Sequence, residues 1–410
     1  MNIAVAQSGG PTCAINASLV GVFRESLKEP AIDAIFGSVN GVEGIIQDHL
    51  IDLKTMIRTN EDMELLRQTP STVLGSCRYK LPDYHEDSSV YEKIAAVLKR
   101  RKIGAFFYIG GNDSMDTVQK LSAYFKEISL DVKVIGIPKT IDNDLCITDH
   151  TPGFGSAAKY VATTMQEIVR DSSVYSMPSI TIVEIMGRNA GWLTAASALA
   201  RNEYSTAPHL IYLPEVDFDM EQFLADVHRI YQEKNNVLIA VSEGIHYADG
   251  SFVSEAKASA TDGFGHAQLG GLAARLAQVI KEHEHAKVRG IELSLLQRAG
   301  AHLASQTDID EAFAAGKMAV EAALSGETGK MVAFERVMAD GQYTCRMKLI
   351  PLSDVANYEK KVPVEWIVPE GNNVTQDFID YALPLIQGVP EIPLENGLPR
   401  YARLKKVLAE

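Results

Sequence analysis

The stretch from Val134 to Asp149 reads Val-Ile-Gly-Ile-Pro-Lys-Thr-Ile-Asp-Asn-Asp-Leu-Cys-Ile-Thr-Asp, and the rest of the chain is organised around it. Its apolar beginning predicts a short buried strand that stops at Pro138. Ligands of open α/β sheets bind in the crevice beyond the carboxyl ends of the strands, so the loop after Pro138 should face such a crevice. Four of its polar side chains would point there: Lys139, Thr140, Asp142 and Asp144.

Strands and helices alternate on both sides of this stretch. Short apolar runs predict strands at 2–6, 34–39, 103–109, 134–138, 180–185, 210–213, 237–241 and 288–293. Longer patterns between them predict helices at about 14–28, 90–101, 115–127, 153–170 and 218–231, with another that ends near 285. This alternation predicts an α/β fold with doubly wound, mostly parallel sheets.

The length of 410 residues exceeds what one hydrophobic core usually supports, so two lobes with a cleft between them are expected. Near the end of the chain, the runs 331–338 and 343–349 flank Asp340-Gly341 and predict a β-hairpin with an Asp-Gly turn. The prolines and aromatic residues of 351–410 indicate a C-terminal segment that wraps the body.

The composition excludes several classes of protein. Hydrophobic residues make up 46% of the chain and charged residues 22%, which is ordinary for a globular protein and argues against disorder. A formal net charge of −14 disfavours non-specific binding to nucleic acid or to an anionic membrane. The sequence has no run of 18 apolar residues and no signal-type N-terminus, so we expect a cytoplasmic protein. Its four cysteines lack the spacing of a zinc site or a disulfide framework.

Loops at other predicted strand ends carry side chains similar to those of the loop after Pro138. They supply arginines, carboxylates and glycines whose backbone N–H groups can approach an anion. These residues are Gly9, Gly10, Arg78, Gly110, Gly111, Asp113, Arg188 and Glu243. The set fits phosphoryl transfer, which needs charge neutralisation, in-line positioning and an acceptor for the proton of the nucleophile. Asp142 is the best candidate for that acceptor, although Asp142-Asn143-Asp144 is also typical of a plain Asx turn.

Six loops occur in the order seen in one enzyme family. They are Gln7-Ser8-Gly9-Gly10-Pro11, Gly75-Ser76-Cys77-Arg78, Gly110-Gly111-Asn112-Asp113-Ser114, Pro138-Lys139-Thr140-Ile141-Asp142-Asn143-Asp144, Met186-Gly187-Arg188 and Gln297-Arg298. From residue 1 to about residue 300 the chain resembles the phosphofructokinases. The resemblance implies a two-lobed phosphofructokinase-like fold with the active site in the cleft between the lobes. It also implies Mg²⁺-dependent phosphorylation of fructose 6-phosphate at its 1-hydroxyl, by a homodimer or homotetramer.

The resemblance further implies a role for each motif residue. Asp142 would accept the proton, and Thr140 and Ile141 would contact the transferred phosphoryl group or the sugar. The donor phosphates would be held by Gly9, Gly10, Arg78 and Gly111. The sugar phosphate would be held by Met186, Gly187, Arg188, Glu243, Arg289 and Arg298, with one of the last two arginines arriving from a neighbouring subunit. Asn112 and Asp144 are the candidate ligands of Mg²⁺.

The same resemblance divides the chain into lobes. Residues 1–147, joined by part of 298–350, would bind the donor phosphates, and residues 148–297 would bind the sugar phosphate. Some positions depart from the family pattern. Asn112 stands where many relatives have a magnesium-binding aspartate, and Ser179 and Leu295 replace residues that contact the sugar phosphate in relatives.

Asp113 and Lys139 indicate which donor is used. Relatives that use ATP usually carry glycine at both positions, and this chain resembles the pyrophosphate-dependent branch. A carboxylate at Asp113 would stand where the α-phosphate of ATP must lie, and two anions in contact repel each other. Lys139 would stabilise the phosphate leaving group. The sequence therefore predicts pyrophosphate as the donor, with an ATP-dependent kinase or a silent, phosphate-sensing subunit as the alternatives.

Overall fold

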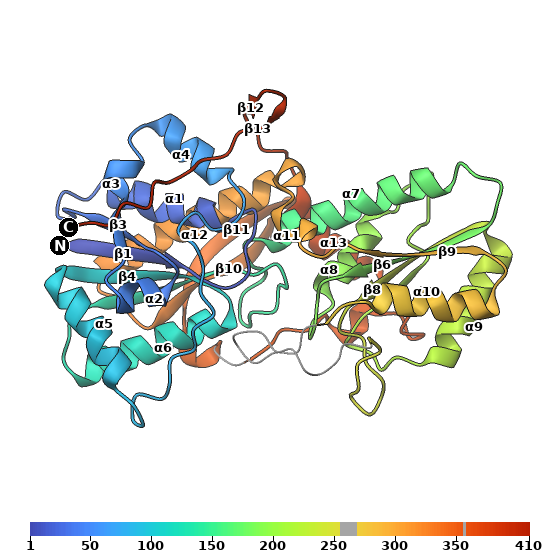
Figure 1. Ribbon diagram of the computed structural model, residues 1–410, viewed down its shortest axis with the longest axis horizontal. Helices are drawn as coiled ribbons and strands as arrows, with labels where there is room; N and C mark the ends of the chain where they lie inside the picture. The colour runs from blue at the N-terminus through green and yellow to red at the C-terminus, as the bar shows by residue number, and fades with distance from the viewer. Residues whose placement is uncertain (255–268, 356–357) are drawn as a thin grey trace.

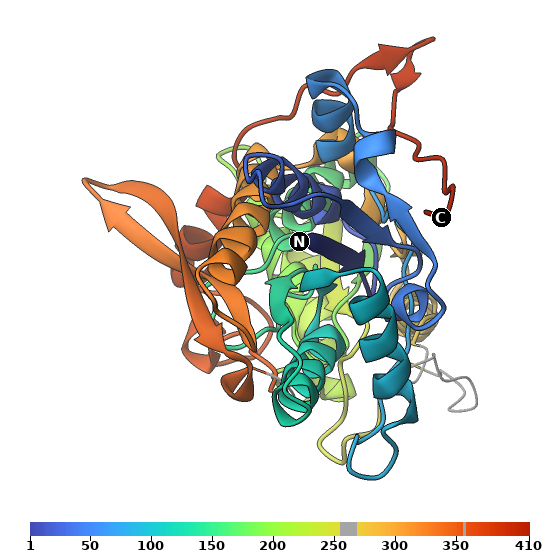
Figure 2. The ribbon, with the colours of Figure 1, turned by 90° about the vertical axis from the view of Figure 1, so that its left-hand side faces the viewer.

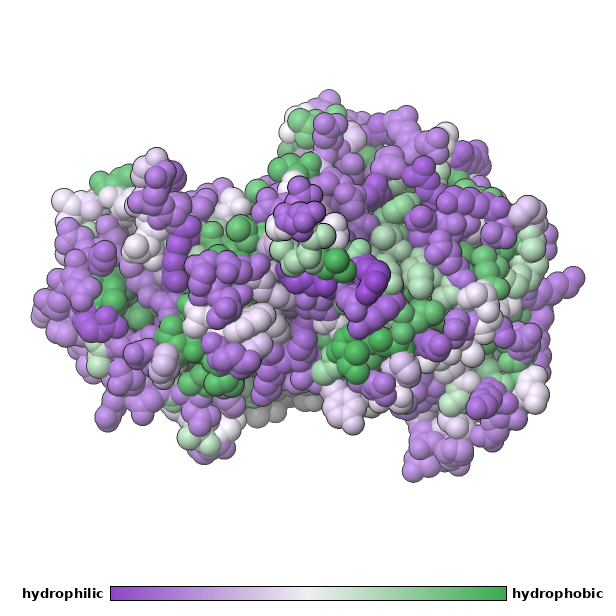
Figure 3. Space-filling view, turned by 180° about the vertical axis from the view of Figure 1, so that it is seen from behind, coloured by the Kyte–Doolittle hydropathy of each residue, from purple (hydrophilic) through white to green (hydrophobic). Residues whose placement is uncertain are grey.

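A computed structural model of the chain describes residues 1–254, 269–355 and 358–410. Two β-sheets, each covered by helices, form two lobes that lie side by side (Figure 1). The α/β class expected from the alternating pattern is confirmed. The surface is largely hydrophilic when it is seen from behind, with separate hydrophobic areas (Figure 3).

The larger sheet has the strand order β11-β10-β5-β4-β1-β2-β3. Its strands are β1 (Asn2–Gln7), β2 (Ile35–Ser38), β3 (Leu50–Asp52), β4 (Ile103–Gly110), β5 (Lys133–Pro138), β10 (Lys330–Ala339) and β11 (Gln342–Pro351). The pairs between β2 and β10 are parallel, whereas the outer strands β3 and β11 pair antiparallel. Strand β5 is buried almost throughout, as strands of a sheet covered on both faces are.

Helices cover both faces of this sheet (Figure 2). One face packs against α1 (Ile15–Ser26) and α12 (Gln306–Leu324), and the other packs against α5 (Ser89–Arg100) and α6 (Asn112–Glu127). The helices α1 and α12 cross so closely that a Cβ atom on Gly21 would lie 2.1 Å from the carbonyl oxygen of Phe313. Glycine is therefore required at this crossing.

The smaller sheet is entirely parallel in the described part of the chain, with the strand order β7-β8-β6-β9. Its strands are β6 (Ser179–Ile185), β7 (Leu210–Tyr212), β8 (Asn236–Ser242) and β9 (Lys287–Glu292). One face packs against α7 (Phe154–Ser172) and α8 (Trp192–Ala196), and the other packs against α9 (Met220–Glu233) and α10 (Leu272–His283).

The chain after α12 returns to both lobes. Strands β10 and β11 form the expected hairpin, and its turn residues Asp340 and Gly341 have φ values of 52° and 76°, as an Asp-Gly hairpin turn requires. Helix α13 (Gln376–Ala382) joins the core of the smaller lobe, while the backbone N–H of Ala409 donates to Leu50 in the larger lobe. The shorter elements are α2 (Val42–Ile46), α3 (Leu53–Met56), α4 (Asn60–Arg67), α11 (Leu296–Ala299), β12 (Leu394–Glu395), β13 (Leu398–Pro399) and 3₁₀ turns at Ser197–Ala200, Ala301–Leu303, Leu352–Asp354, Val364–Trp366 and Leu383–Ile386.

The start of helix α6 differs from the sequence-based prediction, and part of one predicted loop lies outside the described residues. Helix α6 begins at Asn112 rather than at Met115, because the Gly111 backbone already starts the first turn, and this places Asp113 within that turn. The polar, glycine-rich stretch 247–271 predicts a surface excursion, and its residues 255–268 lie outside the described residues. Among the residues that the structure describes, we find no helix with the length and apolar character needed to cross a membrane.

Candidate active site

A cavity of about 680 Å³ is lined by residues that follow the carboxyl ends of strands from both sheets. The loops after β1, β4 and β5 contribute from the larger sheet, and the loops after β6 and β8 contribute from the smaller one. This is the position at which open parallel sheets bind their ligands. The cavity therefore lies between the two lobes.

Most residues singled out from the sequence line this one cavity. They are Gly9, Gly10, Arg78, Gly111, Asn112, Asp113, Lys139, Thr140, Ile141, Asp142, Asp144, Met186, Arg188, Glu243 and Arg298. Within the described chain, Gly110, Gly187 and Arg289 lie outside the lining. Gly187 is directly behind it, since its N–H donates to Oε1 of Glu243 over 3.4 Å. Arg289 lies on β9 with its side chain 46% exposed, 3.6 Å from Asp171.

The loop after β1 brings backbone groups to the cavity. Gly9 has a φ of 74°, a conformation that glycine adopts without strain, and its carbonyl oxygen accepts a hydrogen bond from Ser76. A Cβ atom on Gly9 would lie 3.2 Å from Nζ of Lys139, and a Cβ atom on Gly10 would lie 3.1 Å from a terminal nitrogen of Arg298. The two glycines therefore allow two cations to approach the backbone of this loop.

Helix α6 points its N-terminus toward the cavity. Asp113 lies in its first turn, where the helix dipole favours a negative charge. The Nδ2 atom of Asn112 donates to Asp144 over 3.4 Å, while its Oδ1 atom is buried and has no hydrogen-bond partner among the described residues. A carboxylate and an unpaired amide oxygen thus lie together at the start of the helix.

Lys139 is almost completely buried beneath the loop after β1. Its exposed fraction is 2%, and its Nζ atom donates to the carbonyl oxygen of Gly10 over 2.6 Å. Burial lowers the pKa of this ammonium group to about 8, although the charge of Asp142 acts in the opposite direction. The cation is held in place but is poorly solvated, so a bound anion would stabilise it.

The hydroxyl of Thr140 orients the candidate base. Its oxygen accepts a hydrogen bond from the backbone N–H of Asp142 over 3.1 Å and lies 3.4 Å from the carboxylate of the same residue. Burial raises the pKa of Asp142, and Lys139 acts against that rise. Burial together with the charge of Asp142 raises the pKa of Asp144 to about 7. A carboxylate with a raised pKa accepts a proton more readily than an ordinary aspartate does.

The smaller lobe supplies the other wall of the cavity. Met186 and Arg188 follow β6, and the backbone N–H of Met186 donates to the buried side chain of Gln297 over 3.3 Å. Glu243 follows β8, and burial raises its pKa to about 7. Arg298 reaches the cavity from α11. Two arginines and a carboxylate therefore surround this end of the cavity, which suits an anionic ligand that also carries hydroxyl groups.

The C-terminal segment contributes residues that the sequence patterns did not indicate. Tyr358 and Glu359 line the cavity, and Glu359 accepts a hydrogen bond from Asn189 over 2.7 Å. This contact replaces the helix-capping role that Asn189 suggests by its position before α8, whose N-cap is Gly191. The backbone N–H of Lys360 donates to the backbone carbonyl oxygen of Asp144 over 2.7 Å. The indole N–H of Trp192 donates to the carbonyl oxygen of Lys360.

Lys80 is a missed lining residue that a local signal could have revealed. It lies two residues after Arg78 in a segment without helical structure, and side chains two residues apart in extended chain point to the same side. The segment around Glu359 lacks such a signal, because its place depends on contacts with residues far away in the sequence.

The cavity combines an anion-binding end with a group that can accept a proton. Backbone N–H groups, Lys139 and Arg78 can neutralise phosphates, Asp142 lies beside them, and the arginines of the smaller lobe can hold a second anionic group. An arrangement of this kind can move a phosphoryl group between two bound molecules with little covalent chemistry by the protein.

Comparisons with known proteins agree with this chemistry. The family model named Phosphofructokinase matches residues 2–323. The pyrophosphate–fructose 6-phosphate 1-phosphotransferase of Halomonas elongata is 42% identical over 408 residues, which are 99% of this chain and 96% of that protein. The enzyme of the same name from Xanthomonas campestris is 42% identical over 99% of this chain and 96% of its own. The crystal structure of the pyrophosphate-dependent phosphofructokinase of Nitrosospira multiformis matches with a TM-score of 0.91 and 37% identity, covering 100% of this chain and 98% of that one.

Proposed function

Because this chain belongs to the phosphofructokinase family, we propose that it transfers a phosphoryl group from pyrophosphate to the 1-hydroxyl of fructose 6-phosphate. The products are fructose 1,6-bisphosphate and phosphate, and the reaction is reversible because the phosphoryl group moves between phosphate compounds of similar energy. The observation that carries the proposal is the pair Asp113 and Lys139 in one cavity, in a chain 42% identical to relatives named for this reaction.

In this reaction Asp142 accepts the proton of the 1-hydroxyl as its oxygen attacks the phosphoryl group. Its raised pKa and its position beside the Thr140 hydroxyl support that role. Lys139 stabilises the phosphate that leaves, because its desolvated ammonium group lies against the donor loop. The backbone of Gly9, Gly10 and Gly111 and the side chain of Arg78 hold the donor phosphates.

Asp113 excludes ATP from the donor site. Pyrophosphate ends at its second phosphate, whereas ATP must place an α-phosphate further along the same groove. The carboxylate of Asp113 occupies the first turn of α6 beside that groove, and two neighbouring anions with little water between them repel strongly. The same charge is harmless to pyrophosphate, which has no atoms there.

The sugar phosphate is held by the smaller lobe, through Met186, Arg188, Glu243 and Arg298, with Gly187 supporting Glu243 from behind. Arg289 serves the cavity of a neighbouring subunit. Strand β9 forms the exposed edge of its sheet, and the Arg289 side chain is 46% exposed, which supports a homodimer or homotetramer joined along this edge. Sedimentation equilibrium should then give a mass of two or four chains, and a monomer would contradict this assembly.

The residues present fit a Mg²⁺ ion near the start of α6. The buried Oδ1 atom of Asn112 lacks a partner among the described residues, and the Asp144 carboxylate lies beside the same side chain, so the site offers the oxygen ligands that Mg²⁺ prefers. Bound with pyrophosphate, the ion would neutralise charge on the donor. Asn112 and Asp144 would hold it from the protein side, and the donor phosphates would supply most other ligands.

An assay of the purified chain tests the proposal. Fructose 6-phosphate and Mg²⁺ are supplied with either pyrophosphate or ATP, and fructose 1,6-bisphosphate is quantified. We expect turnover with pyrophosphate, no more than trace turnover with ATP, and loss of turnover in Asp142→Asn. Turnover with ATP alone would identify an ATP-dependent kinase of the same fold. Binding of pyrophosphate without turnover of either donor would identify a silent, phosphate-sensing subunit.

A further inference from the structure

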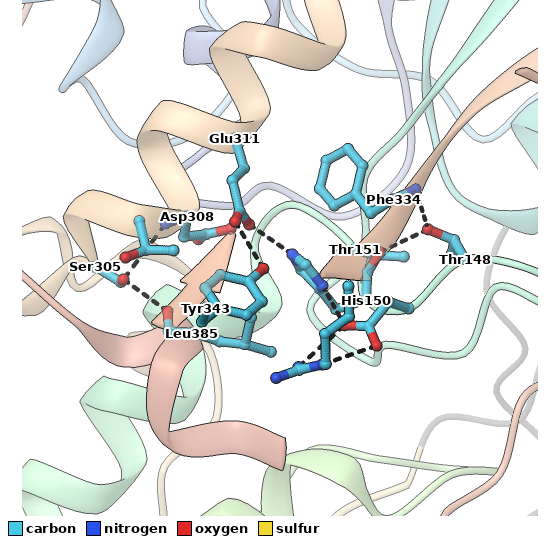
Figure 4. A network of polar contacts seen from close by, with 12 residues as sticks. Thr148, His150, Thr151, Ser305, Asp308, Glu311, Phe334, Tyr343 and Leu385 are labelled. Atoms are coloured by element: carbon cyan, nitrogen blue, oxygen red, sulfur yellow. Dashed lines mark hydrogen bonds and ion pairs between the residues drawn. The ribbon is translucent and has the colours of Figure 1, made fainter. Parts of the chain in front are cut away.

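A buried group of charges lies in the segment that follows Asp142 and Asp144, outside the lining of the cavity (Figure 4). At its centre is His150, which is only 2% exposed. Its Nδ1 atom is 2.8 Å from the carboxylate of Asp149, and its Nε2 atom is 2.6 Å from the carboxylate of Glu311 on α12. None of these residues lines the cavity, and the proposed chemistry does not use them.

The geometry favours a positive charge on His150. A neutral imidazole has one N–H group and can donate to one acceptor, whereas both ring nitrogens of His150 face a carboxylate at hydrogen-bond distance. Burial acts to lower the pKa of His150, but the two carboxylates outweigh it and raise the pKa above its ordinary value. Both nitrogens are also engaged in these bonds, so the nearby Cys345 does not complete a metal site with them.

The neighbours of His150 in the sequence anchor the residues on both sides of Asp142, through the side chain of Asn143 and the backbone of Thr140. Asp149 precedes His150, and its carbonyl oxygen accepts a hydrogen bond from the hydroxyl of Tyr381 over 2.6 Å. The oxygen of that hydroxyl accepts a hydrogen bond from the side-chain amide of Asn143 over 2.8 Å. Thr151 follows His150, and its hydroxyl donates to the carbonyl oxygen of Thr140 over 2.8 Å. A shift of His150 would therefore move both anchors of the residue proposed as the base.

We infer that His150 is a positioning residue for the phosphoryl transfer, which as an imidazolium holds Asp149 and Thr151 and thereby orients Asp142 toward the sugar hydroxyl. The inference rests on the proposed function. When His150 loses its proton, either Asp149 or Glu311 keeps a buried charge with one donor fewer, which favours a rearrangement of the loop. The maximal rate then falls while the substrates still bind.

Other charged and titratable groups face this centre from every neighbouring element. Arg336 on β10 donates to both oxygens of Asp149, and Tyr343 on β11 donates to Glu311 over 2.7 Å. Lys360 donates to the carbonyl oxygen of Asp149, and Tyr381 and Cys345 complete the surroundings. Burial raises the pKa of Cys345 to about 12, and it raises those of the two tyrosines further, so none of the three changes charge near neutral pH.

The variant Glu311→Gln separates His150 from other groups that titrate at alkaline pH. The amide oxygen still accepts a hydrogen bond from Nε2, but the lost negative charge lowers the pKa of His150. The assay uses saturating pyrophosphate, so that the bound anion keeps Lys139 protonated. In the variant, we expect the alkaline fall of kcat to move to lower pH by ~1 unit or more. The KM values at pH 6 should stay within about twofold of wild type. Glu321→Gln, the same change on the exposed surface of α12, should leave the profile unmoved.

A titration of the wild-type enzyme supports the comparison without any substitution. Imidazole ¹⁵N signals follow the protonation of His150, and circular dichroism verifies that the fold persists over the same pH range. We expect the His150 titration and the alkaline fall of kcat to coincide. Constant kcat while His150 titrates would overturn the inference, and so would an unshifted profile in Glu311→Gln. Absence of pyrophosphate turnover at every pH would instead refute the proposed function.

Discussion

The two sides of the loop from Lys139 to Thr151 carry similar charges in opposite electrostatic states. On the cavity side, burial pushes Lys139 and Asp144 toward their neutral forms: the pKa of Lys139 falls to about 8, and that of Asp144 rises to about 7. On the far side, hydrogen-bonded partners hold Asp149 and His150 in their charged forms, whereas burial lowers the pKa of the neighbouring Lys360 to about 8. Burial acts to raise the pKa of Asp149, but hydrogen bonds from His150 and Arg336 lower it to about 2.

The difference separates charges that wait for a ligand from charges that are already satisfied. A buried charge without a full set of partners costs free energy, and natural proteins keep such groups mainly where a ligand completes them. The far side is complete within the chain, so its charges hold the loop in place. On the cavity side, pyrophosphate, Mg²⁺ and the sugar phosphate would add partners for Lys139, Asp142 and Asp144.

The largest expected effect comes from removing the base on the cavity side. Asp142→Asn keeps the shape of the side chain but cannot accept the proton, so kcat should fall by about 10³-fold. Steady-state assays with pyrophosphate measure this loss, and circular dichroism should be unchanged. Activity above a tenth of the wild-type value would remove Asp142 from this role.

Lys139→Met should lower kcat/KM for pyrophosphate by about 10²-fold, because the leaving phosphate loses a desolvated cation. The lowered pKa also predicts the pH profile of the wild type. Lys139 is charged below its pKa, so kcat/KM for pyrophosphate should be highest below about pH 8 and fall as the pH rises through that value. A methionine variant with the same alkaline fall would assign the titration to another group.

On the far side, Arg336→Met should destabilise the fold by about 2 kcal/mol, because the mostly buried carboxylate of Asp149 loses a bidentate partner. Urea unfolding at pH 7 measures the loss. Arg346→Met, which breaks an exposed pair with Glu335 on the same hairpin, is the control and should cost less than about 0.5 kcal/mol. Equal effects of both substitutions would contradict the distinction between the two sides of the loop.

The ion pair of Arg336 and Asp149 also predicts how the free energy of unfolding changes at acid pH. The pKa of Asp149 is depressed in the folded chain, so its stabilisation is complete above the ordinary aspartate pKa of 3.8 and is lost as the pH falls toward about 2. The shift corresponds to about 2 kcal/mol. Unfolding free energies measured from pH 5 down to pH 2 should fall less steeply in Arg336→Met than in the wild type.

The smallest expected effect is a gain in the free energy of unfolding rather than a loss. Asp144→Asn removes a charge that burial disfavours, so without Mg²⁺ the variant should be more stable than wild type by up to about 1 kcal/mol at pH 8. The pKa of Asp144 is raised from 3.8 to about 7, so the gain should be complete above pH 7, shrink as the pH falls and vanish below about pH 4, where the side chain is neutral in both the folded and the unfolded chain. A loss of stability at pH 8 would mean that this carboxylate is already satisfied, like those on the far side.

The residues on the cavity side of the loop could be predicted from the sequence, whereas the contacts on the far side could not. Apolar runs that end in glycine, proline and charged residues indicated the strands and the loops at their carboxyl ends, and these loops form the cavity. Their residues are close in the sequence to the strands that carry them. The partners of the far side come from distant segments: Glu311 is 161 residues from His150, and Tyr381 is 238 residues from Asn143.

No local pattern predicts such pairs, since each partner lies on an element that is placed by packing of the whole fold. For the same reason the sequence did not indicate Tyr358 and Glu359, which line the cavity from a segment without regular structure. The start of α6 was also misplaced by three residues, because Asn112 and Asp113 are poor helix formers in general but favourable in a first turn.

Calorimetric titration of the Asp142→Asn chain with pyrophosphate and with ATP, in the presence of Mg²⁺, most directly tests whether the cavity side of the loop is built for pyrophosphate. With fructose 6-phosphate left out, this slow variant has no acceptor for the phosphoryl group, so the heat reports binding alone. We predict that pyrophosphate binds at least about 10²-fold more tightly than ATP, since Asp113 opposes the α-phosphate. Equal or tighter binding of ATP would contradict the account.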